Sequence, residues 1–303
     1  MSERQPGISG TARNMAAFRA LESEKPVSQR LFFDPYAKRF LSAPQRFLVT
    51  SSRFALFRRL VEGYADYRVP GARTSGIART RLIDDWINQE IENGARQIVV
   101  LGAGFDCRAL RLISLANTRV IEIDRPAMIA YKNGVLGAED NDRQHVARVQ
   151  VDFQKDSLAQ CLLGAGYERG LKTLFLWEGV TNYLDEGSVA AVFACVAANA
   201  PPGSKIAFTY IHRDAVDGRF DAPGLHDLLV SLRRRGEPWT FGFDPGTLPS
   251  YLDARGFKLV VDLGAAEYRR LYWKAMPDRG IGYEFYRTAL AEVMYDKGNV
   301  RGQ

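Results

Sequence analysis

Two glycines and an aspartate have the residue types and the spacing that hold a nucleoside. Gly102 and Gly104 follow a short apolar run and precede a segment compatible with a helix. Glycines there let a ligand approach the backbone closely, and the start of a helix offers free N–H groups. Asp124 ends the next apolar run, about 20 residues further on, where a carboxylate can accept hydrogen bonds from a ribose diol. The pattern therefore predicts a nucleoside site at the ends of two strands.

Position 107 distinguishes this pattern from the one that binds dinucleotides. Dinucleotide-binding loops carry a third glycine there, which lets the backbone approach the pyrophosphate. The chain has Cys107 instead, which disfavours an NAD-dependent oxidoreductase. A glycine turn and an acidic strand end without the third glycine are expected for an adenosine that carries no phosphates, and S-adenosylmethionine is such a ligand. A tight turn with Asp124 as a simple helix cap remains the structural alternative.

The elements that must position these residues alternate between strands and helices from residue 96 onwards. Short apolar runs bounded by turn residues are typical of strands that are buried on both faces. These runs are residues 98–101, 119–123, 147–151, 173–177, 205–210 and 257–261. Segments compatible with helices lie between most of them, among them residues 107–114 and, most clearly, residues 184–199 and 249–255. The alternation predicts an α/β fold with a doubly wound, mostly parallel sheet.

Residues 1–95 are predicted to be mostly helical. Their spacing of apolar residues and turn signals predicts four helical segments. These segments are residues 11–21, 36–41, about 47–67 and a last one that follows Ser75 and ends at Asn93 and Gly94. We therefore expect an N-terminal helical cap over residues 1–95 and a ligand-binding domain over residues 96–303.

A second departure from the alternation lies between the fifth and sixth predicted strands. Residues 213–243 are rich in Arg, Asp and Gly and have no clear strand or helix period. The ligand-binding domain is therefore expected to carry a lid, inserted at about 213–245.

Composition and charge exclude several classes of protein. With 46% hydrophobic and 25% charged residues in 303, the chain is neither disordered nor fibrous. No apolar run approaches the ~18 residues of a membrane-spanning helix, and no secretory signal is apparent. Three scattered cysteines argue against disulfides and against a structural zinc site, so we expect a cytoplasmic protein without a membrane partner. The net charge of +6 comes with interspersed carboxylates, which favours a mixed solvated surface over a nucleic-acid interface.

Six short motifs occur in a characteristic order along the chain. They are residues 34–37 (DPYA), 78–81 (ARTR), 100–106 (VLGAGFD), 122–126 (EIDRP), 151–153 (VDF) and 177–184 (WEGVTNYL). In this order, and over about residues 10–300, the chain resembles the S-adenosylmethionine-dependent leucine carboxyl methyltransferase family. The resemblance is greatest to its bacterial branch, which includes O-methyltransferases of polyketide pathways. It implies S-adenosyl-L-methionine as cofactor and the Rossmann-like fold of class I methyltransferases.

The resemblance implies roles for residues that bind the cofactor. Arg79 matches the arginine that binds the methionyl carboxylate, a group that a guanidinium can bind through two hydrogen bonds. Arg81 is the fallback for this role. Asp124 matches the residue that binds the ribose hydroxyls, with Glu122 as a weaker candidate, while Gly102 and Gly104 would face the methionyl part and the ribose. The family aspartate that faces the adenine amine corresponds to Asp152, and Phe153 would contact the adenine ring.

Two further residues lie after the predicted fourth strand, where doubly wound sheets place ligand groups. Glu178 matches a family glutamate beside the methionyl portion, and it can hold an ammonium or act as a base. An N-cap role for Glu178 is disfavoured because Asp185 already fits that position. Tyr183 matches a tyrosine near the acceptor. His212 ends the fifth strand and is a candidate for the acceptor pocket.

The expected reaction follows from the absence of recognisable base or metal motifs. No His, Cys or carboxylate spacing suggests a metal, and no G-x-S-x-G motif is present. A carboxylate acceptor is ionised at pH 7 and needs no base. The sequence therefore favours O-methylation of an anionic, natural-product-like small molecule at a carboxylate, with basic lid residues such as Arg213 or Arg219 attracting it. Methylation of a hydroxyl, with Glu178 or His212 as base, is the alternative.

Two other possibilities are weaker. A non-catalytic cofactor-binding protein would retain the glycines and Asp124, but the intact motif from Glu178 to Tyr183 argues against it. The eukaryotic branch of the family methylates the C-terminal carboxylate of a protein, and nothing in this sequence points to such a partner. The acceptor and the oligomeric state cannot be inferred from the sequence.

Overall fold

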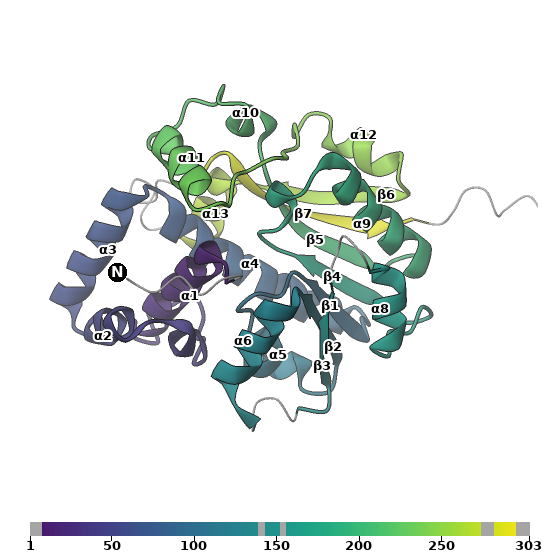
Figure 1. Cartoon of the computed structure of the whole chain (residues 1–303), viewed down its shortest axis with the longest axis horizontal. Coiled ribbons are helices and arrows are strands. Elements are labelled where there is room, and N and C mark those ends of the chain that lie inside the picture. Colours follow the sequence, from purple (N-terminus) through teal and green to yellow (C-terminus); the bar gives the residue numbers. More distant parts are fainter. Residues whose placement is uncertain (1–7, 139–142, 152–155, 274–281, 295–303) are drawn as a thin grey trace, which may run out of the picture.

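A seven-stranded sheet lies at the centre of the computed structural model, which describes residues 8–138, 143–151, 156–273 and 282–294 (Figure 1). The strand order is β3-β2-β1-β4-β5-β7-β6, in which β1 to β5 are parallel and β7 is antiparallel to both of its neighbours. The strands are β1 (Gln97–Leu101), β2 (Arg119–Asp124), β3 (Val146–Gln150), β4 (Thr173–Trp177), β5 (Lys205–Ile211), β6 (Phe257–Leu263) and β7 (Tyr286–Val293). The predicted doubly wound, mostly parallel sheet is confirmed.

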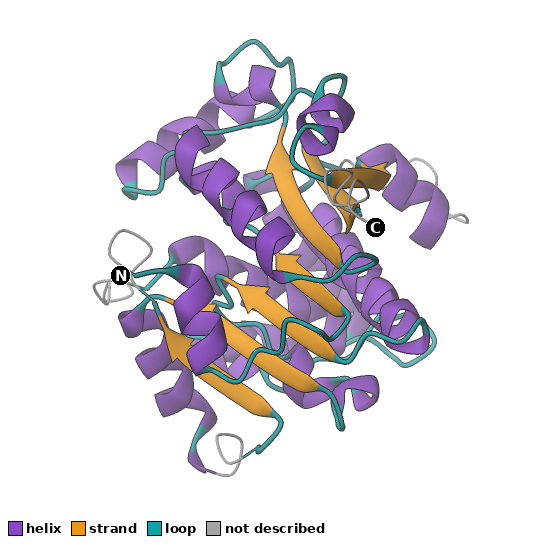
Figure 2. Ribbon diagram, turned by 90° about the vertical axis from the view of Figure 1, so that its right-hand side faces the viewer, coloured by secondary structure: helices purple, strands orange, loops and turns teal. Residues whose placement is uncertain are grey.

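Helices cover both faces of this sheet (Figure 2). One apolar core joins the sheet to α8 (Leu158–Gly164), α9 (Glu186–Asn199) and α12 (Leu248–Asp253). A second core on the opposite face includes α4 (Ala72–Glu92) and α13 (Ala265–Tyr272). All five residues of β1 and of β4 are buried, because both faces of these central strands are covered. No described helix has the length and apolar character needed to span a bilayer.

Further helices and three short 3-10 turns complete the described part of the chain. They are α1 (Gly10–Ser23), α2 (Ala43–Ser51), α3 (Ala55–Arg68), α5 (Arg108–Arg111), α6 (Pro126–Leu136), α10 (Arg213–Val216) and α11 (Leu225–Arg234), with the 3-10 turns η1 (Ala37–Phe40), η2 (Ile113–Leu115) and η3 (Thr181–Tyr183). A third apolar cluster packs α1 and η1 against α6 and Phe105. Since α4 shares a core with the sheet, the hydrophobic core is continuous across residue 95, and the proposed domain division stays a prediction.

Several predicted elements differ from those observed. Residues 47–67 form parts of two helices, because the chain turns at Ser52, whose hydroxyl donates to the carbonyl of Val49 at 2.6 Å. Residues 36–41 form only the turn η1, and residues 107–114 form only α5 and η2. The last N-terminal helix begins before Ser75, at Ala72.

One strand, β7, was absent from the prediction. Its sequence, YRTALAEV, is rich in alanine and carries charged residues, so its β-propensity is low. Its place between two strands, rather than its local sequence, makes it a strand. By contrast, Asp185 caps α9 as expected, and its carboxylate accepts the Ser188 N–H at 2.7 Å.

Candidate functional site

A cavity of about 540 Å³ lies beside the carboxyl ends of β1, β2 and β4. The strand order reverses between β1 and β4, and ligands of open α/β sheets bind at such a switch point. The walls come from the loops after these three strands, from α1 and α4, and from α11 with the segment that follows it. The N-terminal region and the insert at about 213–245 therefore both contribute to one cavity of the size that holds small molecules.

The loop after β1 is folded around the end of β2. Gly102 and Gly104 have φ angles of +73° and +47°, and a Cβ at Gly102 would overlap the side chain of Val180. The backbone N–H groups of Gly102 and Ala103 both donate to the carbonyl of Ile123, at 2.8 and 2.9 Å. A glycine at position 102 is thus needed for both conformation and space.

Asp124 holds the same loop through its side chain. Its Oδ2 accepts the Gly104 N–H at 2.6 Å, and its Oδ1 accepts the Arg125 N–H at 2.7 Å. The carboxyl lines the cavity and is 8% exposed. Burial raises its pKa, and these two hydrogen bonds only partly oppose that effect. Each oxygen retains a lone pair, so the group can still accept hydrogen bonds from ligand hydroxyls.

Two of the predicted site residues, Arg79 and Glu178, are brought together from α4 and the end of β4. Arg79 Nε donates to Glu178 Oε1 at 2.7 Å, and both residues line the cavity. The guanidinium also lies 4.7 Å above the ring of Tyr286. Arg79 Nη1 makes no hydrogen bond with the residues that the structure describes, so it can bind a carboxylate.

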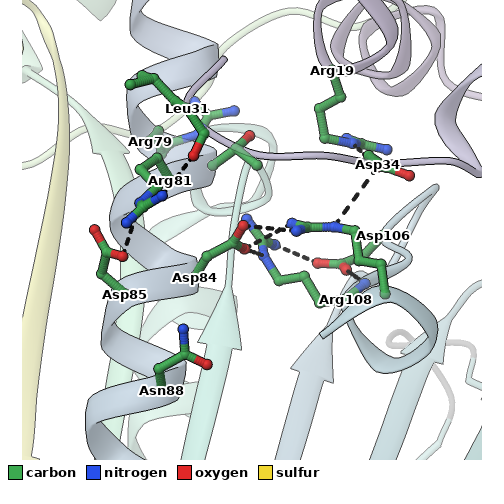
Figure 3. A network of polar contacts seen from close by, with 12 residues as sticks. Arg19, Leu31, Asp34, Arg79, Arg81, Asp84, Asp85, Asn88, Asp106 and Arg108 are labelled. Atoms are coloured by element: carbon green, nitrogen blue, oxygen red, sulfur yellow. Dashed lines mark hydrogen bonds and ion pairs between the residues drawn. The ribbon is translucent and has the colours of Figure 1, made fainter. Parts of the chain in front are cut away.

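A buried ion network extends from this pair to the N-terminal helices (Figure 3). Arg108 donates to Asp84, Asp106 and Glu178, and Arg111 donates to both oxygens of Asp84. Four carboxylates therefore face four guanidinium groups: Asp34, Asp84, Asp106 and Glu178 against Arg19, Arg79, Arg108 and Arg111.

The sequence prediction missed most of this network. The only local signal was the spacing of Arg108 and Arg111 directly after the glycine loop, and it does not identify their partners. The network also argues against the alternative that the glycine loop binds the pyrophosphate of a dinucleotide. The first N–H of α5 donates to Asp106 Oδ1 at 2.7 Å, so the N-terminus of this helix faces an anion of the protein itself.

The network depresses the pKa values of two carboxyls. Burial by itself raises the pKa of Glu178 and of Asp106, but the charge of Arg108 and other nearby cations outweighs burial and lowers both values to about 2. Glu178 accepts hydrogen bonds at both oxygens, at 2.7 Å from Arg79 and 2.9 Å from Arg108. A base works best when its pKa is near the working pH, so Glu178 is a fixed anion rather than a proton acceptor.

The depressed values predict acid sensitivity. Both folded-state pKa values lie below the ordinary ones, so the stabilisation is complete above about pH 4.5 and is lost as the pH falls toward 2. For Glu178 the shift corresponds to about 3 kcal/mol. Urea denaturation followed by circular dichroism between pH 7 and pH 2.5 measures this loss. The Glu178→Gln variant should show a shallower dependence on pH, and equal slopes for the two proteins would contradict the assignment.

Tyr183 also lines the cavity and belongs to a hydrogen-bonded chain. Its hydroxyl donates to Thr11 Oγ1 at 3.3 Å, which donates to Glu237 Oε2 at 2.8 Å. Glu237 Oε1 also accepts the Gly10 N–H at 3.0 Å, so the insert is tied to the start of α1. Burial raises the pKa of Tyr183, and the phenol therefore keeps its proton.

Two aromatic donors also line the cavity. Trp239 lies beside Tyr183, whereas Tyr283 Oη is buried and forms no hydrogen bond with the residues that the structure describes. Unpaired buried donors carry a desolvation cost that a ligand oxygen can remove. This part of the cavity wall is therefore prepared for a ligand that carries hydrogen-bond acceptors.

Other predicted residues lie away from the cavity. His212 is not among the lining residues, and its Nδ1 accepts the Asp214 N–H at 3.1 Å as a cap of α10. Arg81 is paired with Asp85 at 2.9 Å on the outer side of α4. Glu122 is buried against Lys132 and Arg148, at 2.8 and 2.9 Å.

Two predicted residues and the question of a metal remain. Asp152 and Phe153 lie outside the described residues. Within the described ranges, no group of three or more His, Cys, Asp or Glu side chains is arranged to hold a metal ion.

Comparisons with known proteins show the family of this chain. A sequence model of the leucine carboxyl methyltransferase family matches residues 12–197. A protein of Streptomyces coelicolor, named as a candidate S-adenosyl-L-methionine-dependent methyltransferase, is 32% identical over 75% of this chain and 77% of its own length. A Parafrankia protein with the same description is 31% identical, over 90% and 85%.

The same fold occurs among solved structures. The crystal structure of a candidate methyltransferase of Thermobifida fusca superimposes with a TM-score of 0.58 at 18% identity, covering 90% of this chain and 97% of the other. The fold is that of the class I methyltransferases, and the glycine loop, Asp124 and Arg79 provide groups that suit an adenosyl ligand with an amino-acid tail. This chain therefore belongs to the leucine carboxyl methyltransferase family and is an S-adenosylmethionine-dependent methyltransferase.

Proposed function

We propose that this enzyme methylates a carboxylate of a small organic acceptor and forms a methyl ester. One observation carries the proposal: neither side chain expected as a general base is placed to act as one. Glu178 is held between two arginines with a pKa of about 2, and His212 lies outside the cavity lining. A carboxylate is already ionised at pH 7, so its methylation requires no base.

The cofactor would be held by residues of the cavity wall. Arg79 would bind the methionyl carboxylate through Nη1, and Glu178 would accept the ammonium with its remaining lone pairs. Asp124 would accept hydrogen bonds from the ribose hydroxyls, while Gly102 and Gly104 allow the close approach. When bound, S-adenosylmethionine supplies a methyl group that its sulfonium already activates.

The protein then has to orient the acceptor and exclude water. The hydrogen bonds from Gly10 and Thr11 to Glu237 support the exclusion of water, because they join the insert to the N-terminal region beside the cavity. Three side chains could orient the methyl acceptor, since they line the cavity and can donate hydrogen bonds to its oxygens: Arg235, Trp239 and Tyr283.

Arg235 replaces the two arginines that the sequence suggested for attracting an anion. Neither Arg213 nor Arg219 lines the cavity: Arg213 lies over the ring of Phe241, and Arg219 is exposed and paired with Asp214 at 2.6 Å. The apolar and aromatic residues around the donors suit a natural-product-like acceptor, such as an acid of the polyketide type. The three free cysteines support a location in the cytoplasm.

Methylation of a hydroxyl is the second candidate, and one observation favours it. In the chain from Tyr183 through Thr11 to Glu237, each hydroxyl donates toward the carboxylate. A hydroxyl acceptor that donates to Tyr183 Oη could release its proton along this chain to Glu237. In that case Glu237 takes the role that was expected of Glu178 or His212.

The two candidates are separated by the stability of their products. Purified enzyme is incubated with S-adenosylmethionine labelled in the methyl group and with a panel of aromatic and aliphatic acids and the matching alcohols and phenols. We expect transfer to acids, with a product that loses its label in mild alkali as methanol. An alkali-stable product from phenols, abolished by Glu237→Gln, would favour the ether instead.

A further inference from the structure

The outward face of α2 and α3 is an apolar surface with no counterpart in the chain. No residue of α3 is buried. Eight large apolar side chains on α2, α3 and the turn between them are 41–82% exposed: Phe47, Leu48, Phe54, Leu56, Phe57, Leu60, Tyr64 and Tyr67. Figure 1 shows both helices at the edge of the molecule, away from the sheet. None of the eight lines the cavity, so this face is separate from the proposed catalytic site.

The basic residues around this face are all arginines, and residues 43–68 contain no lysine. Arg46, Arg53, Arg58, Arg59 and Arg68 lie on or between the two helices, and none forms an ion pair with a described residue. The acids of α3, Glu62 and Asp66, instead pair with Arg73 of α4, at 3.3 and 2.6 Å. The outward face therefore combines aromatic rings with guanidinium groups, which is the composition enriched where proteins meet.

No contact within a single chain requires the glycine that lies inside α3. Gly63 is exposed, and a Cβ built on it would meet nothing within 4 Å. Glycine within a helix costs about 1 kcal/mol relative to alanine. On the helical surface Gly63 lies beside Leu60 and Tyr67, one turn away on either side. A second helix that crosses α3 here could approach its backbone closely, whereas a lipid surface would gain nothing from the missing side chain.

We infer that this face binds a second copy of the chain and forms a two-fold symmetric dimer. The exposed area of the eight side chains is roughly 1,000 Å² per copy, from their exposed fractions and about 200 Å² for a large side chain. Standard interfaces bury about 800 Å² per partner. In a two-fold arrangement the same face meets itself, so arginines at the edge of one copy can lie over tyrosine or phenylalanine rings of the other. The two α3 helices would cross near Gly63.

Multi-angle light scattering of the purified chain, across two decades of protein concentration, tests this inference. We expect particles of two chains for the wild type. Leu60→Asp places a charge within the apolar face and should raise the dissociation constant of the dimer at least about 100-fold. Leu60 is exposed in the single chain, so the affinity of the variant for S-adenosylhomocysteine should be unchanged. Ile113→Asp is the matched control, because Ile113 is 92% exposed in η2, outside this face.

Gly63→Leu provides a second variant, which should stabilise the fold of the single chain while it weakens the dimer. Leucine favours the helix more than glycine and has open space in the single chain, but it would fill the crossing point. We expect this variant to be folded and monomeric. A wild type that is monomeric at every concentration, or a dimer that neither variant weakens, would overturn the inference. So would a monomer that sediments with vesicles of phosphatidylglycerol but not of phosphatidylcholine, since the face would then bind an anionic membrane.

Discussion

Replacing Asp124 with alanine is expected to weaken the binding of S-adenosylhomocysteine at least about 100-fold. In the proposed cofactor site this carboxylate would accept from two ribose hydroxyls, and hydrogen bonds to a charged group contribute about 1.5–3 kcal/mol each. The variant also releases the Gly104 N–H, which the carboxylate holds at 2.6 Å. Isothermal titration calorimetry at pH 7 measures the loss directly.

Two further proteins make this result interpretable. Asp124→Asn retains one acceptor oxygen and should bind with intermediate affinity. Asp253→Ala removes the same charge from the exposed end of α12 and should bind as the wild type does. Because burial raises the pKa of Asp124, wild-type affinity should also fall at a higher pH than an exposed aspartate would give. Wild-type affinity in a folded Asp124→Ala protein would contradict the assigned role.

The largest expected effect on stability is that of Asp84→Asn. Asp84 accepts from Arg108 Nε at 2.8 Å and from Arg111 Nη2 and Nη1 at 2.7 and 2.8 Å, and all three side chains are at most 5% exposed. Removing its charge leaves two buried guanidinium groups with too little compensation, which typically costs about 3–5 kcal/mol. We expect the thermal midpoint to fall by about 5–8 °C.

The neighbouring residue provides the control. Asp85 is 39% exposed and pairs with Arg81, four residues earlier on α4, at 2.9 Å. It also accepts the Tyr272 hydroxyl at 3.0 Å, a hydrogen bond that the amide oxygen of asparagine can still accept. Exposed pairs of this kind contribute less than about 1 kcal/mol, so Asp85→Asn should shift the midpoint only slightly. Differential scanning calorimetry of both variants compares the same substitution at adjacent positions. Similar shifts for the two would show that the buried network does not stabilise the fold as described.

The parts of the site that were predictable depend on local sequence. Gly102, Gly104 and Asp124 sit at the ends of apolar runs, and parallel strands bring such ends to one edge of a sheet. The resemblance added Arg79, Glu178 and Tyr183, and the structure places all three on the same cavity. Their functional roles remain predictions.

Local patterns failed where a residue's partner is distant in the chain. His212 directly follows β5, where the backbone of Phe243 in the insert pairs with residues 211–213, and its side chain caps α10 instead of lining the cavity. The end of the cavity near Tyr183 depends on Thr11 and Glu237, which are 226 residues apart. No periodicity or motif reports such a contact.

The sequence by itself determined six of the seven strands, the glycine loop and the acidic end of the second strand, because strand burial, left-handed turns and strand-end carboxylates follow from neighbouring residues. Only the tertiary structure decided which arginines meet which carboxylates. The pairing of Arg108 with Asp84 and Glu178 joins segments separated by 24 and 70 residues. It also turned Glu178 from a candidate base into a fixed anion. The pKa of a buried group depends on the charges that surround it in space, and adjacent residues in the chain do not specify those charges.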